Sequence, residues 1–263
     1  MIHHSNARGG AQSALNRMSV PLQSESEAPL DIRICASRES LRTALRTQGR
    51  IVYSCLNGYT LRALLLERSY DDLLASGKVA FIVDGLLAVR HLRRLGIRAE
   101  RICGRDLLDE ALRVHSGSVT LIGGGARDGS RLLSLIRQYT GRHVDLVTPP
   151  MFQSTTQVHE FARALGPRIS PDSLVVVCIR SPLQDILSGA LSTWWPQSVF
   201  INVGAVLDDI AGGRMGSIRF FSRFGLEWLY RLVVSPSRTW PKIAAMVRKR
   251  LGRSYTNYRW HQL

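Results

Sequence analysis

Six short apolar segments, rich in β-branched residues, alternate along the chain with segments of helical periodicity. Nearly every position within each apolar segment is hydrophobic, so both faces of the resulting strand would avoid water. Strands of this kind are typical of a parallel sheet that helices cover on both sides. The six segments are Ile51–Leu56, Val79–Val83, Ser118–Ile122, Val144–Val147, Leu174–Ile179 and Val199–Val203.

The segments between these runs repeat apolar residues at helical spacing and are long enough to be crossover helices. They are Tyr59–Arg68, Leu107–Val114, Ser130–Tyr139, Thr156–Leu165 and Leu183–Thr193. The sequence therefore predicts an α/β protein with a Rossmann-like parallel sheet core and helices on both faces.

The two ends of the chain differ from this core in composition. Residues 1–30 are rich in Ser, Gln, Asn and Gly, which predicts a disordered leader. Residues 31–218 would form the α/β core, and residues 219–263 a basic C-terminal appendage. After Glu227 the chain holds eight Lys and Arg residues and no acid.

Within this appendage, apolar residues from Trp240 to Leu251 recur at helical spacing, flanked by basic residues. This pattern favours an amphipathic helix on an anionic membrane surface, where each basic residue contributes about 1 kcal/mol. A packed terminal helix with a solvated basic face is the alternative.

The length of the apolar runs, the cysteine spacing and the net charge together predict where the protein is located and which partners it binds. No segment approaches the roughly 20 apolar residues that span a bilayer, which predicts a soluble or peripheral protein. The four cysteines form no CxxC pair, which indicates reduced thiols and a cytoplasmic location. A pI near 10.7 requires an acidic partner. No zinc-finger or RNP-type pattern accompanies the charge, so anionic lipid and sugar nucleotides are expected partners, and nucleic acid is not.

Polar residues follow the carboxyl ends of the predicted strands. In open parallel sheets, ligands bind at these carboxyl ends. Asn57 follows the first run and could bind a substrate hydroxyl or cap the next helix. Asp84 and Gly85 follow the second run. A strand-end carboxylate is a candidate general base, with a helix cap as the alternative.

The third run ends in three glycines around Gly124, whose backbone amides could cradle a phosphate or sugar. A tight turn is the alternative. Asp128 replaces the third glycine of a dinucleotide fingerprint, which argues against a nicotinamide cofactor. Further on, Gln184, Asp208 and Asp209 follow later strands and could orient hydroxyls. The histidines show no metal-ligand spacing, so neither a metal nor another cofactor is expected.

Seven motifs in this order resemble the WecG/TagA/CpsF family of glycosyltransferases over about residues 31–242. They are LN, strand-DG, ERICGRDL, strand-GGG, SPLQD, VGAVLDDIAG and GLEWLYRL-x5-R, of which the last is the most specific. The resemblance implies a GT-E-like fold. It also implies inverting, metal-independent transfer from a nucleotide sugar, usually UDP-linked, to a polyprenyl-diphosphate-linked sugar on the cytoplasmic membrane face.

The resemblance implies roles for the strand-end residues. Asp84 matches the family's catalytic base, and Asn57 and Gln184 match polar residues of its sugar pocket. Asp208 matches the acid at a strand end, and Arg101 the basic residue before the Gly-x-Asp-Leu turn.

Two further matches lie in the appendage, where Arg231 and Arg238 correspond to arginines that close over the diphosphate of the donor. The third arginine expected there falls on Pro241, beside Lys242. The chain also departs from the family pattern at Cys55 and Arg180. These departures resemble the xanthan-type branch.

The expected activity is therefore β-1,4-glucosyl transfer from UDP-glucose to glucosyl-diphosphoprenol by a peripheral enzyme of the bacterial inner membrane. Three alternatives stay open: a UDP-N-acetylmannosamine(uronic acid) transferase, a nucleotide-dependent oxidoreductase, and a basic membrane adaptor without activity. A homo-oligomer is also left open.

Overall fold

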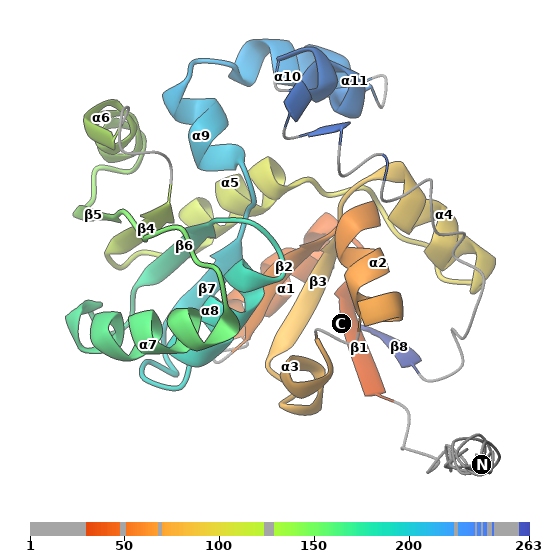
Figure 1. The fold of residues 1–263 in the computed structure, drawn as a ribbon, viewed down its shortest axis with the longest axis horizontal. Coiled ribbons are helices and arrows are strands. Elements are labelled where there is room, and N and C mark those ends of the chain that lie inside the picture. Colours follow the sequence, from red (N-terminus) through yellow and green to blue (C-terminus); the bar gives the residue numbers. More distant parts are fainter. Residues whose placement is uncertain are drawn as a thin grey trace, which may run out of the picture.

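The computed structural model describes residues 30–47, 51–67, 70–123, 129–223, 226–234, 236–237, 239–240, 244 and 258–263. Residues 1–29 of the predicted leader, most of the predicted basic helix, Gly124 and Arg238 lie outside these ranges. In the described residues the chain forms one sheet of eight parallel strands with helices on both faces (Figure 1). The Rossmann-like α/β prediction is confirmed.

The strands are β1 (Leu30–Cys35), β2 (Val52–Leu56), β3 (Val79–Val83), β4 (Val119–Gly123), β5 (Val144–Val147), β6 (Leu174–Cys178), β7 (Val199–Asn202) and β8 (Tyr258–Gln262). Their order across the sheet is β5-β4-β6-β7-β2-β3-β1-β8. All six strands predicted from the apolar runs are present, and their ends agree within about one residue. Strands β1 and β8 are not among the apolar runs of the sequence.

The helices are α1 (Arg38–Thr47), α2 (Gly58–Glu67), α3 (Asp71–Ala75), α4 (Leu86–Arg94), α5 (Gly104–Val114), α6 (Gly129–Thr140), α7 (Thr155–Leu165), α8 (Leu183–Leu191), α9 (Val206–Ala211), α10 (Met215–Arg223) and α11 (Glu227–Val234), with a 3-10 turn η1 (Gly166–Arg168). The five predicted crossover helices are among them. In the described residues no helix is both long and apolar enough to cross a membrane.

Two hydrophobic layers, one on each face of the sheet, hold these elements together. Helices α1, α5, α6 and α9 pack on one face, and α2, α3, α4, α7 and α8 on the other. Successive residues of a strand alternate between the layers: Ala80 and Ile82 of β3 face the first, whereas Phe81 and Val83 face the second. This two-sided burial is the reason why the strands are continuous apolar runs in the sequence.

The C-terminal residues do not follow the predicted helical appendage. Residues 258–262 form β8, which pairs in parallel with β1 at the edge of the sheet. The hydroxyl of Tyr258 donates to Leu64 O at 2.8 Å, and the ring of Trp260 packs edge-on against His91 at 5.7 Å. The predicted boundary between residues 218 and 219 falls within α10.

Candidate active site

The polar residues predicted as a site follow the carboxyl ends of neighbouring strands. The ends of β6, β7, β2 and β3 are adjacent in the sheet. Gln184 follows β6, Asp208 follows β7, Asn57 follows β2 and Asp84 follows β3. Parallel strands present their carboxyl ends on one edge, so the chain brings these four residues to a common edge.

Asn57 and Asp84 occupy matching positions on two paired strands. Leu56 and Val83 are partners in the β2–β3 register, and the N–H of Asp84 donates to Leu56 O at 3.0 Å. Gly85 follows with φ +95°, in the region that favours glycine, and so turns the chain sharply into α4. The half-buried Asp84 carboxyl is therefore held at the start of a defined turn.

The side-chain oxygen of Asn57 caps α2. It accepts hydrogen bonds from the backbone N–H groups of Tyr59 at 2.9 Å and Thr60 at 3.0 Å. The helix cap, one of the two alternatives for Asn57, is thus present. A cap uses only the carbonyl oxygen, so it is compatible with a substrate contact by the amide nitrogen.

Arg101 lies on an extended segment that crosses the ends of β1 and β3. The N–H of Glu100 donates to Ala36 O at 2.8 Å, and the N–H of Ile102 donates to Val83 O at 2.9 Å. These two bonds fix the residue between them, half-buried Arg101, at the carboxyl edge.

The next residues begin α5 with a reciprocal cap. Asp106 accepts from the backbone N–H and the thiol of Cys103, both at 3.1 Å, and pairs with Arg38 at 3.1 Å. Burial raises the pKa of Cys103 to about 12, and the charges of Asp106 and Asp84 add to that rise. Cys103 is therefore a neutral neighbour of Asp84.

Gly104 lets the first turn of α5 approach the site closely. A Cβ atom there would lie 2.9 Å from Val203 O and 3.2 Å from the Cys55 sulfur. Both atoms belong to strand ends, so only glycine fits without displacing α5. The predicted Gly-x-Asp-Leu turn thus has a packing role at the ends of β7 and β2.

Gln184 lies in the first turn of α8 and is 2% exposed. Its amide nitrogen donates to Ser181 Oγ at 3.0 Å, while its buried carbonyl oxygen has no hydrogen-bond partner among the described residues. A buried acceptor of this kind is uncommon in a folded chain.

Asp185, the residue after Gln184, is the centre of a buried polar network that the sequence pattern does not predict. Asp185 is fully buried and accepts from Ser54 Oγ, from Tyr70 OH at 2.5 Å, and from Asn202 Nδ2 at 2.8 Å. It also accepts from Ser181 Oγ at 3.3 Å. Burial raises the pKa of Asp185, although these four hydrogen bonds oppose the rise. The network joins α8 to β2 and β7, which places Gln184 relative to the strand ends.

The two adjacent acids of α9 have different surroundings. Asp208 is half-buried, and burial together with the charge of Asp208 raises the pKa of Cys178 to about 12. Asp209 is 5% exposed and pairs with Arg231 of α11 at 2.9 Å and Arg214 at 3.4 Å. Asp209 therefore links α9 to α11.

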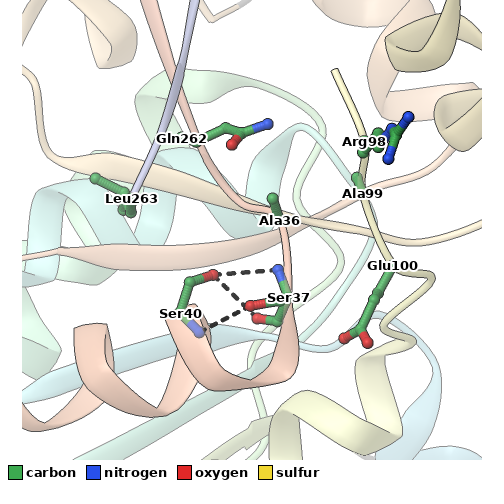
Figure 2. Close-up of a pocket in the computed structure, with 8 residues that line it drawn as sticks. All are labelled: Ala36, Ser37, Ser40, Arg98, Ala99, Glu100, Gln262 and Leu263. Atoms are coloured by element: carbon green, nitrogen blue, oxygen red, sulfur yellow. Dashed lines mark hydrogen bonds between the residues drawn. The ribbon is translucent and has the colours of Figure 1, made fainter. Parts of the chain in front are cut away.

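A separate cavity of about 460 Å³ opens at the ends of β1 and β8, beside the start of α1 (Figure 2). Its described lining is Ala36, Ser37, Ser40, Arg98, Ala99, Glu100, Gln262 and Leu263. None of these is a predicted site residue. No group of three or more His, Cys, Asp or Glu side chains within the described ranges is arranged to hold a metal ion.

The fold is that of an α/β protein with a single parallel sheet, and the predicted site residues follow the carboxyl ends of neighbouring strands. A model of the glycosyl transferase WecG/TagA/CpsF family matches residues 30–259. The chain belongs to this family. It is a glycosyltransferase of cell-surface polysaccharide synthesis, and the family implies nucleotide-sugar donors and lipid-linked acceptors.

Proposed function

We propose that this glycosyltransferase moves a glucosyl group, with inversion, from UDP-glucose to glucosyl-diphosphoprenol at the cytoplasmic membrane face. The observation that carries this proposal is the pairing of Asp84 and Asn57 at the ends of two hydrogen-bonded strands, with Arg101 beside them. This arrangement offers a base, a hydroxyl-binding amide and a cation on one edge. Those are the groups that transfer from a sugar diphosphate requires.

In the proposed reaction Asp84 accepts the proton of the acceptor hydroxyl while the oxygen of that hydroxyl attacks the anomeric carbon of the donor sugar. The bond from that carbon to the diphosphate oxygen breaks, and UDP leaves with the electron pair. Attack from the face opposite to UDP inverts the anomeric configuration. A positioned base of this kind contributes about a hundredfold or more.

The departing diphosphate needs positive charge, which Arg231 and Arg238 supply in this proposal. A guanidinium has five N–H donors in a planar fork that matches phosphate oxygens. Arg231 donates to the Asp209 carboxylate at 2.9 Å, close to the end of β7. Gly124, Gln184 and Asp208 are assigned to the sugar and phosphate pocket on their strand-end positions.

The test is transfer by the full chain to glucosyl-diphosphoprenol in membranes, with a panel of UDP-sugars and product detection by mass. We expect product with UDP-glucose and a loss of at least about a hundredfold in turnover for Asp84→Asn. Asp145→Asn, an exposed acid on β5, is the matched control.

Transfer only from UDP-N-acetylmannosamine would keep the enzyme class and overturn the proposed donor. Turnover of Asp84→Asn close to that of the wild type would overturn the role of Asp84. Binding of anionic vesicles with no transfer from any donor would favour the membrane-adaptor alternative.

A further inference from the structure

Helix α4 begins two residues after Asp84 and exposes a face of two leucines followed by three arginines. Leu86 and Leu87 are 47% and 48% exposed, and Arg90, Arg93 and Arg94 are exposed as well. These five positions fall on one side of a helix, at i, i+1, i+4, i+7 and i+8. The exposed face is thus apolar near Asp84 and basic farther along.

The opposite face of α4 is fixed to the rest of the protein. Ala88 and Leu92 are buried in the core, and His91 packs against Trp260 of β8 at 5.7 Å. The helix therefore cannot turn its leucines inward without breaking these contacts. Leu86 and Leu87 remain exposed in the folded chain because α4 is held in this rotation.

The charge of this region has one sign. Between Asp84 and Glu100 the chain contains four arginines and no acidic residue. In the described ranges, none of the three arginines of α4 forms a salt bridge with an acid. Such a surface is complementary to phosphate headgroups, and adjacent exposed leucines match the boundary between headgroups and acyl chains.

Exposed apolar side chains are concentrated on the same side of the molecule. In the part of the chain that the structure describes, nine of the thirteen large ones lie on α4 with its following turn, or between Phe220 and Trp240. Figure 1 shows α4, α10 and α11 on the side toward which the strands run. One surface could therefore bring both segments to a membrane.

We propose that the exposed face of α4, formed by Leu86, Leu87, Arg90, Arg93 and Arg94, is a membrane contact that docks onto an anionic lipid bilayer. The leucines enter the headgroup boundary and the arginines bind lipid phosphates. This contact is distinct from the basic tail, and it holds the Asp84 edge at the membrane surface. That last consequence, presentation of the lipid-linked acceptor to Asp84, rests on the proposed function.

The test measures binding of the full chain to vesicles that contain phosphatidylglycerol, with phosphatidylcholine vesicles for comparison. The vesicles contain no acceptor and no sugar nucleotide, so the result does not depend on the proposed reaction. We expect Arg90→Gln/Arg94→Gln to weaken binding to the anionic vesicles roughly twenty-fivefold, at about fivefold for each charge. Leu86→Ser/Leu87→Ser should weaken it at least about tenfold.

Matched controls change the same residue types on other surfaces. Arg163→Gln/Arg168→Gln removes two exposed arginines from α7 and η1, and Leu135→Ser removes an exposed leucine from α6. We expect a smaller loss for the arginine control, because only long-range charge acts on it, and no loss for Leu135→Ser, because it changes neither charge nor the proposed contact. Thermal unfolding of each variant checks that the fold is retained.

Three outcomes would overturn the proposal. Equal losses in the α4 and control arginine variants would mean that only net charge matters. Unchanged vesicle binding by both α4 variants would mean that other segments of the chain make the membrane contact. A dimer in the wild type that becomes a monomer in Leu86→Ser/Leu87→Ser, with vesicle binding retained, would assign this face to a second copy of the chain.

Discussion

The guanidinium of Arg231 on α11 lies 2.9 Å from the carboxylate of Asp209 on α9. Asp209 is 5% exposed and follows the end of β7, so this contact ties the appendage to the carboxyl edge of the sheet. Arg214 pairs with the same carboxylate at 3.4 Å. One buried acid thus fixes two arginines of the segment that follows it.

Replacing Asp209 by Ala should loosen α11 and reduce activity. The variant removes a charged hydrogen-bond partner worth about 1.5–3 kcal/mol, which corresponds to roughly a ten- to hundredfold loss of turnover if it acts on the transition state. Limited proteolysis should cut the chain between residues 223 and 240 faster than in the wild type. Asp145→Ala is the control. A loss of activity in Arg231→Ala but not in Asp209→Ala would show that Arg231 acts without this anchor.

Asn57 can be tested for its two functions separately. Asn57→Ser keeps an oxygen that can cap α2 but removes the amide, whereas Asn57→Ala removes both. We expect near wild-type stability for Asn57→Ser and a loss of about 1 kcal/mol for Asn57→Ala, measured by urea unfolding. If the amide binds substrate, both variants should lower kcat/KM alike. Wild-type kinetics for Asn57→Ser would assign Asn57 to the helix cap alone.

Adding one methyl group at Gly104 should displace α5 from the ends of β7 and β2. The new Cβ of Gly104→Ala would lie 2.9 Å from Val203 O, so α5 or the end of β7 must move. We expect a destabilisation of about 1–3 kcal/mol and lower turnover, because Cys103, which caps α5, is a neighbour of Asp84. Gly216→Ala on α10, where a Cβ would meet nothing within 4 Å, is the control and should be neutral or slightly stabilising. Equal unfolding midpoints for the two variants would contradict this packing role.

The sequence predicts the core of the fold well because a strand that is buried on both faces is a continuous apolar run in the sequence. Strands such as β3 and β6 are apolar at every position, and few other structures require this. Strands β1 and β8 are not continuous apolar runs. Arg33 and Asp31 interrupt β1. Strand β8, at the edge of the sheet, reads YRWHQ, and its residues are half-buried or exposed.

The pairing of β8 with β1 changes how the appendage must be tested. The charge pattern of the sequence predicts that residues 219–263 form one separate unit, for which deletion beyond Gly225 is the natural experiment. Such a deletion would also remove β8 from the sheet, together with the bond from Tyr258 to Leu64. Loss of folding would then hide any loss of membrane binding, so substitutions are needed in place of truncation.

The sequence predicts a candidate site at one edge of the sheet but does not predict the contacts around it. Strand ends identify Asn57 and Asp84, because position along a strand is readable from the pattern. It does not show which of the neighbouring acids Asp208 and Asp209 faces α11, since that depends on helix rotation. Similarly, Asn202 in an apolar strand is a visible polar exception, but its partner Asp185 is 17 residues away.

Asp185 should give the fold a measurable pH dependence. Burial raises its pKa above the ordinary value. A carboxyl whose pKa is higher in the folded than in the unfolded chain contributes most below the unfolded pKa of about 3.9. That contribution is lost as the pH rises through the folded pKa, because the folded state then carries a buried charge.

Asp185→Asn removes this titration while keeping an acceptor for Asn202, and the hydroxyls of Tyr70 and Ser181 can accept from the new amide. Its free energy of unfolding relative to the wild type should therefore rise between about pH 4 and 7, measured by urea unfolding. The free energy of unfolding of Asp185→Asn must be compared with that of the wild type at each pH. Glu110 and Asp106 have lowered pKa values, so their protonation in acid destabilises both proteins equally. Asp185→Ala should lose about 3–5 kcal/mol near pH 4, since it leaves several donors unsatisfied, and this deficit relative to the wild type should shrink as the pH rises. If Asp185→Asn instead became relatively less stable as the pH rose, the ionised carboxylate would be the form that the four hydrogen bonds select, and they would outweigh burial.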